Sequence, residues 1–575
     1  MFLSDEQDLS AYVQHSYAPR ELTAELTSTY HNNLDITDPT EVADFLTSHP
    51  ANDTYYSLLN NEIILTDAGI NQALAYDNEV YNNANFSDKT EAYYLDVKLK
   101  VYDFLIGATL WNKAEGPGAQ YNDQMFMGFD QGQSWRPAHK YFFVKYDKNI
   151  NSKLNFSNFL RYKVHDFDKD NSIVRYRRNY TTPNRYTLQH LLAGFVPTYD
   201  SLYLFQKSNQ LREELKLLYQ PIDRIDVVAG IEFRFSSIQG DYTGSSKNNA
   251  EQNGAPLTNI DGGNQFFSQD FGAYAQTGIS LIENLKMTLG LRYDYNKVRE
   301  DEGYGHVFNP RLTLVYSPKG FIFKAIYAEA FKDATNREKY STAAGKRELT
   351  NPTLQPEKVK NYEFSVGKDF NESLMITAAA YYSEYSNIIQ EVAVQRDDGT
   401  FTNQNQAKGK AKIIGVNAMA DYKWGNLTCY ANYTYTLPFA IDPTDSNGNP
   451  MLDADSIPYK ELRISDIADH QINIGANYLF RDVLNANLRV NIMSERKTGL
   501  ETTVPTNPDK FDPYFILNGA LNYSPKNLGL TIQLSIFNIL NTEYYSPGLD
   551  QATAELASSL KQNGRNMYLS LIYEF

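Results

Sequence analysis

The last ten residues of the chain, 566–575, follow a period of two. One face of this segment carries five apolar or aromatic side chains, those of Met567, Leu569, Leu571, Tyr573 and Phe575. The other face includes Asn566, Ser570 and Glu574. Such a period is typical of a β-strand with one apolar face. The chain is therefore expected to end on an amphipathic strand whose final residue is aromatic.

The same alternation recurs along the chain from about residue 211 onward. In 485–492, polar residues at 487, 489 and 491 alternate with Ala486, Leu488, Val490 and Ile492. A polar face and a continuous apolar face fit strands that contact a wet lumen on one side and lipid on the other. At 575 residues the chain is too long for one ordinary soluble core. A large barrel avoids that limit, because each strand packs only against its neighbours and lipid.

The connections between these segments are alternately short and long. Tight links at 282–284, 317–319 and 524–527 alternate with long polar connections such as 332–359 and 438–467. This asymmetry is typical of a barrel with short periplasmic turns and long extracellular loops. It disfavours the alternative of a soluble multi-domain β protein.

Counted back from the C-terminus, the alternation predicts 21 strands. They are expected at 566–575, 528–540, 513–523, 485–495, 468–480, 426–437, 409–422, 373–388, 360–368, 320–331, 307–316, 285–296, 269–281, 225–237, 211–219, 152–166, 138–148, 104–113, 90–101, 20–30 and 8–17. Bacterial barrels normally have an even number of strands, so we expect an all-β antiparallel transmembrane barrel of about 22. The segments 31–89 and 167–210 are expected to be long extracellular loops.

The amino-acid composition further limits the classes of protein to which this chain can belong. The 44 tyrosines suit the aromatic girdles at the edges of a membrane. No apolar run approaches the roughly 20 residues of a transmembrane helix. The net charge of −16 argues against a nucleic-acid-binding protein. The single cysteine, Cys429, excludes an intrachain disulfide.

Several short motifs, taken in order, resemble those of the TonB-dependent outer-membrane receptors. They are 271–276 (FGAYAQ), 290–294 (GLRYD), 309–312 (NPRL), 328–331 (AEAF), 351–358 (NPTLQPEK) and 537–544 (FNILNTEY). The terminal strand resembles the signal that the barrel assembly machinery reads. The similarity covers most of the chain and is strongest over 211–575.

This resemblance implies a receptor in the outer membrane of a Gram-negative bacterium. Its cargo would be a scarce nutrient such as a ferric siderophore, a vitamin or an oligosaccharide. The barrel would be monomeric in outer-membrane lipid and lipopolysaccharide, and it would accept a surface lipoprotein as partner. TonB would act only through a plug domain, which 1–575 lacks together with a signal peptide, so a barrel-only fragment is expected. A passive pore or an adhesin is the alternative.

The candidate ligand-binding residues lie in segments expected to be loops. Arginine planes and tryptophan faces suit delocalised anions, which favours Trp135, Arg136, Arg175, Arg177 and Arg178. The same residues would equally suit lipopolysaccharide phosphates.

Enzymatic and metal-dependent functions are not indicated by the sequence. It shows no constellation of acidic and histidine residues that predicts catalysis, and no cofactor is expected. The loop 332–350 contains no histidine, which disfavours haem as cargo. The run from Asp166 begins like a calcium-binding loop, but it has Asn171 and Arg177 where that loop needs glycine and glutamate. No metal site is therefore predicted.

Overall fold

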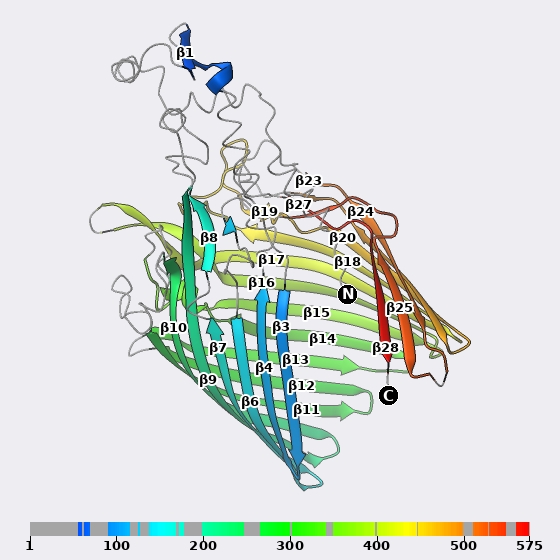
Figure 1. Ribbon diagram of the computed structural model, residues 1–575. Helices are drawn as coiled ribbons and strands as arrows, with labels where there is room; N and C mark the ends of the chain where they lie inside the picture. The colour runs from blue at the N-terminus through cyan, green and yellow to red at the C-terminus, as the bar shows by residue number, and fades with distance from the viewer. Residues whose placement is uncertain are drawn as a thin grey trace.

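The computed structural model is an antiparallel β-barrel (Figure 1). It describes residues 54, 56–59, 62–69, 90–115, 125–126, 137–167, 172–177, 198–245, 265–298, 302–340, 349–396, 399–445, 447–497, 510–526, 528–547 and 559–573. No helix in this described part is long and apolar enough to cross a membrane.

Nineteen long strands of the described chain form the barrel wall, and consecutive ones are neighbours. They are β3 (Thr90–Val101), β4 (Phe104–Glu115), β6 (Pro137–Asn151), β7 (Leu154–Phe167), β9 (Thr198–Ile222), β10 (Ile225–Ser245), β11 (Gln265–Ile282), β12 (Leu285–Val298), β13 (Glu302–Tyr316), β14 (Phe321–Lys332), β15 (Glu357–Phe370), β16 (Leu374–Gln395), β17 (Phe401–Trp424), β18 (Leu427–Ile441), β20 (His470–Phe480), β21 (Leu484–Met493), β24 (Tyr514–Tyr523), β25 (Leu530–Phe537) and β28 (Asn566–Tyr573). In the barrel order, β28 is the neighbour of β25 on one side and of β3 on the other.

Shorter elements complete the described chain. Three short strands belong to the same sheet, namely β5 (Met125–Phe126), β8 (Ser172–Arg177) and β19 (Glu461–Arg463). Separate two-stranded pairs are β1 (Tyr56–Leu59) with β2 (Glu62–Leu65), β22 (Arg496–Lys497) with β23 (Lys510–Phe511), and β26 (Tyr545–Pro547) with β27 (Ser559–Lys561). The helix α6 (Asn336–Tyr340) follows β14.

The expected barrel is confirmed. Nineteen of the 21 expected strands correspond to the nineteen long strands, while 8–17 and 20–30 lie outside the described residues. The short and long connections also alternate as expected, and they define a turn end and a loop end of the barrel. At one tight link, Gly425 has a φ of 54°, which suits the first position of a two-residue turn.

Some strands are longer at the loop end than the alternation indicates. The β16–β17 hairpin pairs as far as Gln395 and Phe401, within the connection between the expected strands 373–388 and 409–422. In the expected loop 167–210, β8 occupies 172–177 and pairs with the first residues of β9, which begins at Thr198. Outside the expected membrane zone neither face of a strand would contact lipid, so backbone pairing can continue there without an apolar pattern in the sequence.

On β20, β21 and β24 the register places the alternating apolar residues on the outside of the barrel. On β21, the outward Leu488 lies opposite Ala476 of β20 and Gly519 of β24. The next residue, Arg489, lies opposite Gly475 and Asn518 and faces the lumen. Leu488 is 55% exposed in the isolated chain, as a lipid-contacting residue should be. The same two faces continue across neighbouring strands, because a shift by one residue would reverse every side chain.

Candidate functional site

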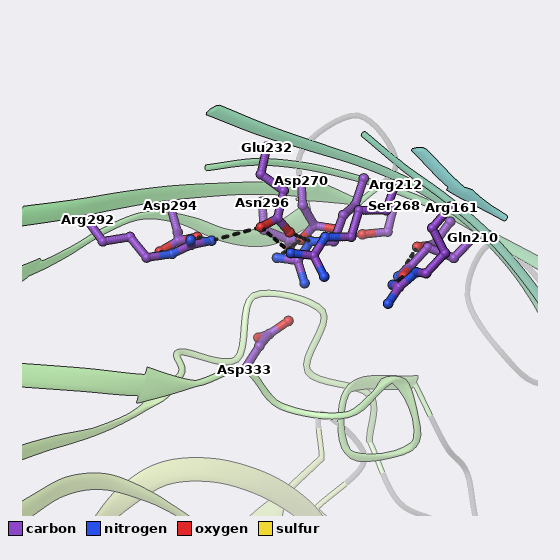
Figure 2. A network of polar contacts seen from close by, with 12 residues as sticks. Arg161, Gln210, Arg212, Glu232, Ser268, Asp270, Arg292, Asp294, Asn296 and Asp333 are labelled. Atoms are coloured by element: carbon purple, nitrogen blue, oxygen red, sulfur yellow. Dashed lines mark hydrogen bonds and ion pairs between the residues drawn. The ribbon is translucent and has the colours of Figure 1, made fainter. Parts of the chain in front are cut away.

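A row of three arginines crosses neighbouring strands of the lumen wall. Arg212 of β9 lies directly opposite Arg161 of β7 and Arg234 of β10. The row continues through Asp270 of β11 and Asn296 of β12 (Figure 2). Like charges directly opposite one another destabilise a sheet, so this row needs compensation.

A row of carboxylates two residues nearer the turn end supplies that compensation. Glu232 lies opposite Glu214 and is only 5% exposed. It forms ion pairs with Arg212 and Arg234, both at 3.0 Å, and with Arg292 of β12 at 3.7 Å. One carboxylate is therefore shared by three guanidinium groups. A buried ion pair stabilises the fold mainly when each of its charges has an opposite charge as partner.

Arg292 and Asp294 extend the network along β12. Arg292 donates from Nη2 and Nε to the Asp294 carboxylate at 2.7 to 3.0 Å, and Asp294 is 2% exposed. Gly272 lies between Glu232 and Asp294 in the carboxylate row. A Cβ at Gly272 would come within 2.8 Å of the Arg292 guanidinium. Glycine at this position therefore leaves room for Arg292 to reach toward Glu232 along the wall.

Arg161 has a different environment from the other arginines. It donates to Gln210 Oε1 at 2.6 Å, and its guanidinium lies 5.7 Å from the centre of the Tyr141 ring. Within the described part of the chain it pairs with no carboxylate, and its buried Nε has no hydrogen-bond partner. Arg161 thus lies at the end of the charged network without a carboxylate partner among the described residues.

A segment between β14 and β15 lies across from this network (Figure 2). It begins at Asp333 and continues into α6, which has a capping box. The Thr335 hydroxyl accepts from the Glu338 backbone N–H at 3.2 Å, and the Glu338 carboxylate accepts from the Thr335 N–H at 2.6 Å. At its end Tyr340 is fully buried and donates to Glu302 at 2.9 Å.

An ion pair between a buried lysine and a partly exposed aspartate fixes the start of this segment. Lys339 is 1% exposed and donates to both oxygens of Asp333 at 2.8 and 2.9 Å. Burial raises the pKa of the Asp333 carboxyl above its ordinary value. Lys339 opposes that rise, whereas the nearby Asp270 adds to it. The segment and the charged wall are therefore coupled electrostatically.

The 351–358 motif anchors the far side of the same segment. The Asn351 backbone N–H donates to the Lys339 carbonyl at 2.8 Å, and its side chain donates to the Asn405 carbonyl of β17 at 2.8 Å. Asn405 in turn donates to the Glu338 carbonyl at 3.0 Å, and Leu354 is buried. The motif thus has a structural role in this chain, which is to hold α6 against the inner face of the barrel.

Six of the ten expected site residues lie in the described part of the chain. Trp135, Arg136, Arg178 and Phe575 lie outside the described residues. Arg175 and Arg177 belong to β8, where their backbones are opposite those of Asp200 and Thr198 of β9. Met567, Leu569, Leu571 and Tyr573 are exposed on the outer face of β28, as expected of a lipid-contacting strand.

The expected absence of a metal site is not tested over the whole chain. Asp166 lies at the loop end of β7, 3.9 Å from Lys207, and the rest of the 166–171 run is largely outside the described residues. In the described ranges, no group of three or more histidine, cysteine, aspartate or glutamate residues is arranged to hold a metal ion.

The alternation of polar and apolar residues does not reveal the charged network. Each member occupies a polar position of an expected strand, but the alternation indicates only that it faces the lumen. Which residues meet depends on the register between strands. The Thr335 and Glu338 pair could have indicated α6, since it is the T-x-x-E pattern of a capping box.

Comparisons with known proteins agree with the barrel fold. The family model described as TonB dependent receptor-like, beta-barrel, matches residues 12–539. A search of curated proteins finds no match. Similar solved structures include the ferric-catecholate import receptor Fiu from E. coli K12, with 13% identity and a TM-score of 0.58 over 84% of this chain and 75% of that one.

Two receptors from Pseudomonas aeruginosa are similar to the same degree. The ferric enterobactin receptor PfeA has 14% identity and a TM-score of 0.60, over 85% of this chain and 70% of that one. The outer-membrane ferripyoverdine receptor has 15% identity and a TM-score of 0.59, over 84% and 65%. At these identities the likeness shows the fold alone. The matched family consists of receptors and not of enzymes, and since its model spans most of the sequence, this chain belongs to the TonB-dependent receptor-like β-barrel family.

Proposed function

We propose that this protein is an outer-membrane receptor barrel for TonB-dependent uptake of a scarce nutrient, such as a ferric siderophore, a vitamin or an oligosaccharide. The observation that carries the proposal is the charged lumen wall of a barrel in this family. Glu232 and its three arginines form a rigid polar surface that faces inward, close to a well-anchored segment at the loop end. A polar inner surface of this kind suits a lumen whose contents enter and leave in a controlled way.

The partners follow from this assignment. The outer face would contact lipid and lipopolysaccharide, and the apolar face of β28 would be read by the barrel assembly machinery. TonB would act through a plug domain inside the lumen, and a surface lipoprotein is a further partner that we propose. The barrel itself would be monomeric.

Ligand capture would take place at the loop end. We assign it to the loops within 31–89 and 167–210 and to the connection that precedes β6. Trp135, Arg136, Arg175, Arg177 and Arg178 are the residues that we expect to contact an anionic cargo. The pairing of β8 with the first residues of β9 supports this assignment, because it holds the backbone of Arg175 and Arg177 at the loop end of the barrel.

The proposal can be tested in the native host. The gene would be deleted, and the uptake of radiolabelled ferric enterobactin, cyanocobalamin and maltoheptaose would be measured with and without a protonophore. The expected result is the loss of uptake of one of these compounds on deletion, and an equal loss when the protonophore is added to the parent strain. Uptake that requires the gene but resists the protonophore and a tonB deletion would instead identify a passive pore. No uptake defect, together with a loss of surface attachment, would identify an adhesin.

A further inference from the structure

One carboxylate of β9 faces outward, toward lipid. The residue that follows the lumen-facing arginine of β9 is Glu213, and the register places it on the outer face, opposite Leu160 of β7 and Phe233 of β10. The neighbouring outward residues of its own strand are Leu211 and Leu215. The four nearest outward positions around Glu213 are thus apolar.

Glu213 lies inside the apolar belt of the barrel and not at its edge. Toward the turn end, the outward residues of β9 stay apolar or aromatic as far as Tyr219, which is about 20 Å away along the strand. Toward the loop end, the first polar outward residues of β9 are Asn209 and Lys207, and Lys207 pairs with Asp166 of β7 at 3.9 Å. The loop end of such a barrel faces the outside of the cell, so Glu213 is at the depth of the outer-leaflet acyl chains.

A neighbouring amide fixes the Glu213 carboxylate in place. Asn158 of β7 lies on the same outer face, opposite Leu215, and donates from Nδ2 to Glu213 Oε1. A carboxylate offers about four acceptor positions, and this amide fills one of them. In lipid no water is present to fill the others, so the position is costly unless a polar partner reaches it. Glu213 therefore marks a place where the outer face has a polar partner.

An apolar hollow begins beside Glu213 and crosses the outer faces of β3, β4, β6, β7 and β9. Its volume is about 440 Å³, and apolar and aromatic residues line it. Leu160 and Leu211, two of the four neighbours of Glu213, line the end of the hollow on β7 and β9. Five adjacent strands span about 19 Å across the wall. A hollow of this volume over that length is narrow, which suits a single extended hydrocarbon chain.

The hollow exists because a small residue stands among large ones. Ala108 of β4 lies on the outer face, opposite Val97 of β3 and Phe142 of β6, and all three residues line the hollow. The methyl group of Ala108 is short compared with the side chains on either side of it. Ala108 therefore forms the floor of the hollow.

Apolar contact alone would not select an occupant for this hollow. Lipid tails are as apolar as the residues that line it, so association within a membrane depends on packing and on hydrogen bonds. The hollow supplies the packing, and Glu213 supplies an acceptor. A hydroxyl group both donates and accepts, so it can pair with a carboxyl group in its ionised and in its protonated form. An ammonium group could pair only with the ionised form and would itself have to be buried in lipid.

We propose that this part of the outer face binds a hydroxylated acyl chain of an outer-leaflet lipid. The hydrocarbon part of the chain lies in the hollow, its hydroxyl group pairs with the Glu213 carboxyl group, and Asn158 holds that carboxyl group in place. The site is on the opposite side of the wall from the lumen, so it goes beyond the proposed function and does not depend on the nutrient or on TonB. Its failure would leave the proposed uptake unaffected.

The test is a lipid competition at a single tryptophan, with the full chain reconstituted in brominated phosphatidylcholine. The reporter chain carries Trp111→Phe, Trp135→Phe and Trp424→Phe, and Phe142→Trp places its tryptophan in the hollow. Added lipid A, whose acyl chains carry hydroxyl groups, restores fluorescence where it displaces the brominated lipid. Dimyristoylphosphatidylglycerol, an anionic lipid without those hydroxyl groups, is the comparison. Lipid A is expected to bind at the reporter about fivefold more tightly, as one hydrogen bond within a membrane allows.

Variants of the reporter chain separate the two parts of the site. Glu213→Leu removes the acceptor and should make the two lipids bind equally, whereas Glu213→Gln keeps an acceptor and should hold the preference within about twofold. Ala108→Phe fills the floor of the hollow and should lower lipid A binding about fivefold. The matched control is Ala418→Phe, at an outward alanine of β17 that does not line the hollow, and it should change binding by less than about twofold. Heat-modifiable mobility on gels shows that each variant is folded.

A second reporter gives the outcomes their meaning. A chain that keeps Trp424 as its single tryptophan reports on the outer face at the turn end, away from the hollow, and lipid A should have no advantage there. A preference for lipid A that is equal at the two reporters, or that persists in Glu213→Leu, overturns the site, because the phosphates of lipid A would then explain it. The absence of any preference at the reporter in the hollow overturns it as well.

Discussion

At the scale of single residues, Glu232 is the point on which the charged lumen wall converges. Three guanidinium groups approach within 3.0 to 3.7 Å of its carboxylate, and it is almost completely buried by them. Glu214 lies directly opposite Glu232 but pairs with only one of these arginines, Arg212, at 3.0 Å. A larger part of the charged network therefore depends on Glu232 than on Glu214, although the two carboxylates are neighbours.

Glu232→Ala should therefore destabilise the barrel far more than Glu214→Ala. The first leaves three arginines without their common partner, and breaking a buried ion pair from one side costs about 3 kcal/mol or more. The second removes one pair at a more exposed position and should cost about 1 kcal/mol. Urea unfolding in lipid vesicles, followed by tryptophan fluorescence, measures both. Equal losses would contradict the convergence on Glu232.

Asp333 predicts a pH dependence of the segment that contains α6. Its pKa in the folded protein is raised above the ordinary value of 3.8, mainly because it is buried. A carboxyl group shifted in this direction contributes full stability below pH 3.8, and that contribution is lost as the pH rises through the folded-state pKa. Amide hydrogen exchange of residues 335–340, corrected for intrinsic rates, should show weaker protection as the pH is raised from about 4, and then a plateau. Asp333→Asn should flatten this profile. Protection that grows with pH in the unmodified protein would contradict it.

At the scale of the element, β21 shows how one strand serves two environments. Its outward residues are apolar, and its inward residues are three asparagines, Arg489 and Met493. Only one register keeps both sets correctly placed, because the two faces alternate residue by residue. The tight link at 481–483 helps to fix that register, since Arg481 and Asp482 have φ values of 51° and 57°.

The same substitution on the two faces of β21 should therefore have opposite consequences. Leu488→Arg places a charge against lipid and should destabilise the barrel by about 2–4 kcal/mol if the residue is near the bilayer midplane. Asn487→Arg places the same side chain in the lumen and should change stability by less than about 1 kcal/mol. The folded fraction in vesicles, measured by the mobility of unheated samples on gels, checks both variants. Comparable losses would show that the outer face of β21 does not contact lipid.

Strand positions could be predicted because the alternation is a direct consequence of the two environments. It placed all nineteen long strands that the structure describes. It failed at the loop end of β9, β10, β16 and β17, where pairing continues beyond the membrane. It also could not indicate α6, because a helix of five residues has too few turns to show a period.

At the scale of the whole molecule, closure removes most of the exposed strand edges. The C-terminal strand β28 pairs with β25 over eight residues and is the neighbour of β3 in the barrel order (Figure 1). A barrel of this kind has an apolar belt outside and a polar surface inside, instead of a central core. The described chain accordingly buries few large apolar side chains, and Tyr340 and Val298 at the loop end are the best packed of them.

Two tryptophans provide a test of this arrangement in a bilayer. Trp424 is 71% exposed and faces outward at the turn end, whereas Trp111 faces the lumen with its ring 4.6 Å from that of His139. Trp135→Phe combined with either Trp111→Phe or Trp424→Phe leaves one of the two as reporter. In vesicles of brominated lipid, Trp424 should lose most of its fluorescence and Trp111 little, because only Trp424 contacts lipid. Similar quenching of both would contradict the assignment of the faces.

The sequence by itself determined the class of fold, the direction of each strand and which residues face lipid. Those properties depend on a pattern within each strand, and lipid on one side with a wet lumen on the other imposes that pattern locally. Only the tertiary structure decided which lumen residues meet. Arg212 and Arg292 are 80 positions apart yet both reach Glu232, and Asn473 and Asn538 belong to one cavity. These contacts depend on the register between strands. Backbone hydrogen bonds and turns set that register, and the side-chain pattern within a single strand does not encode it.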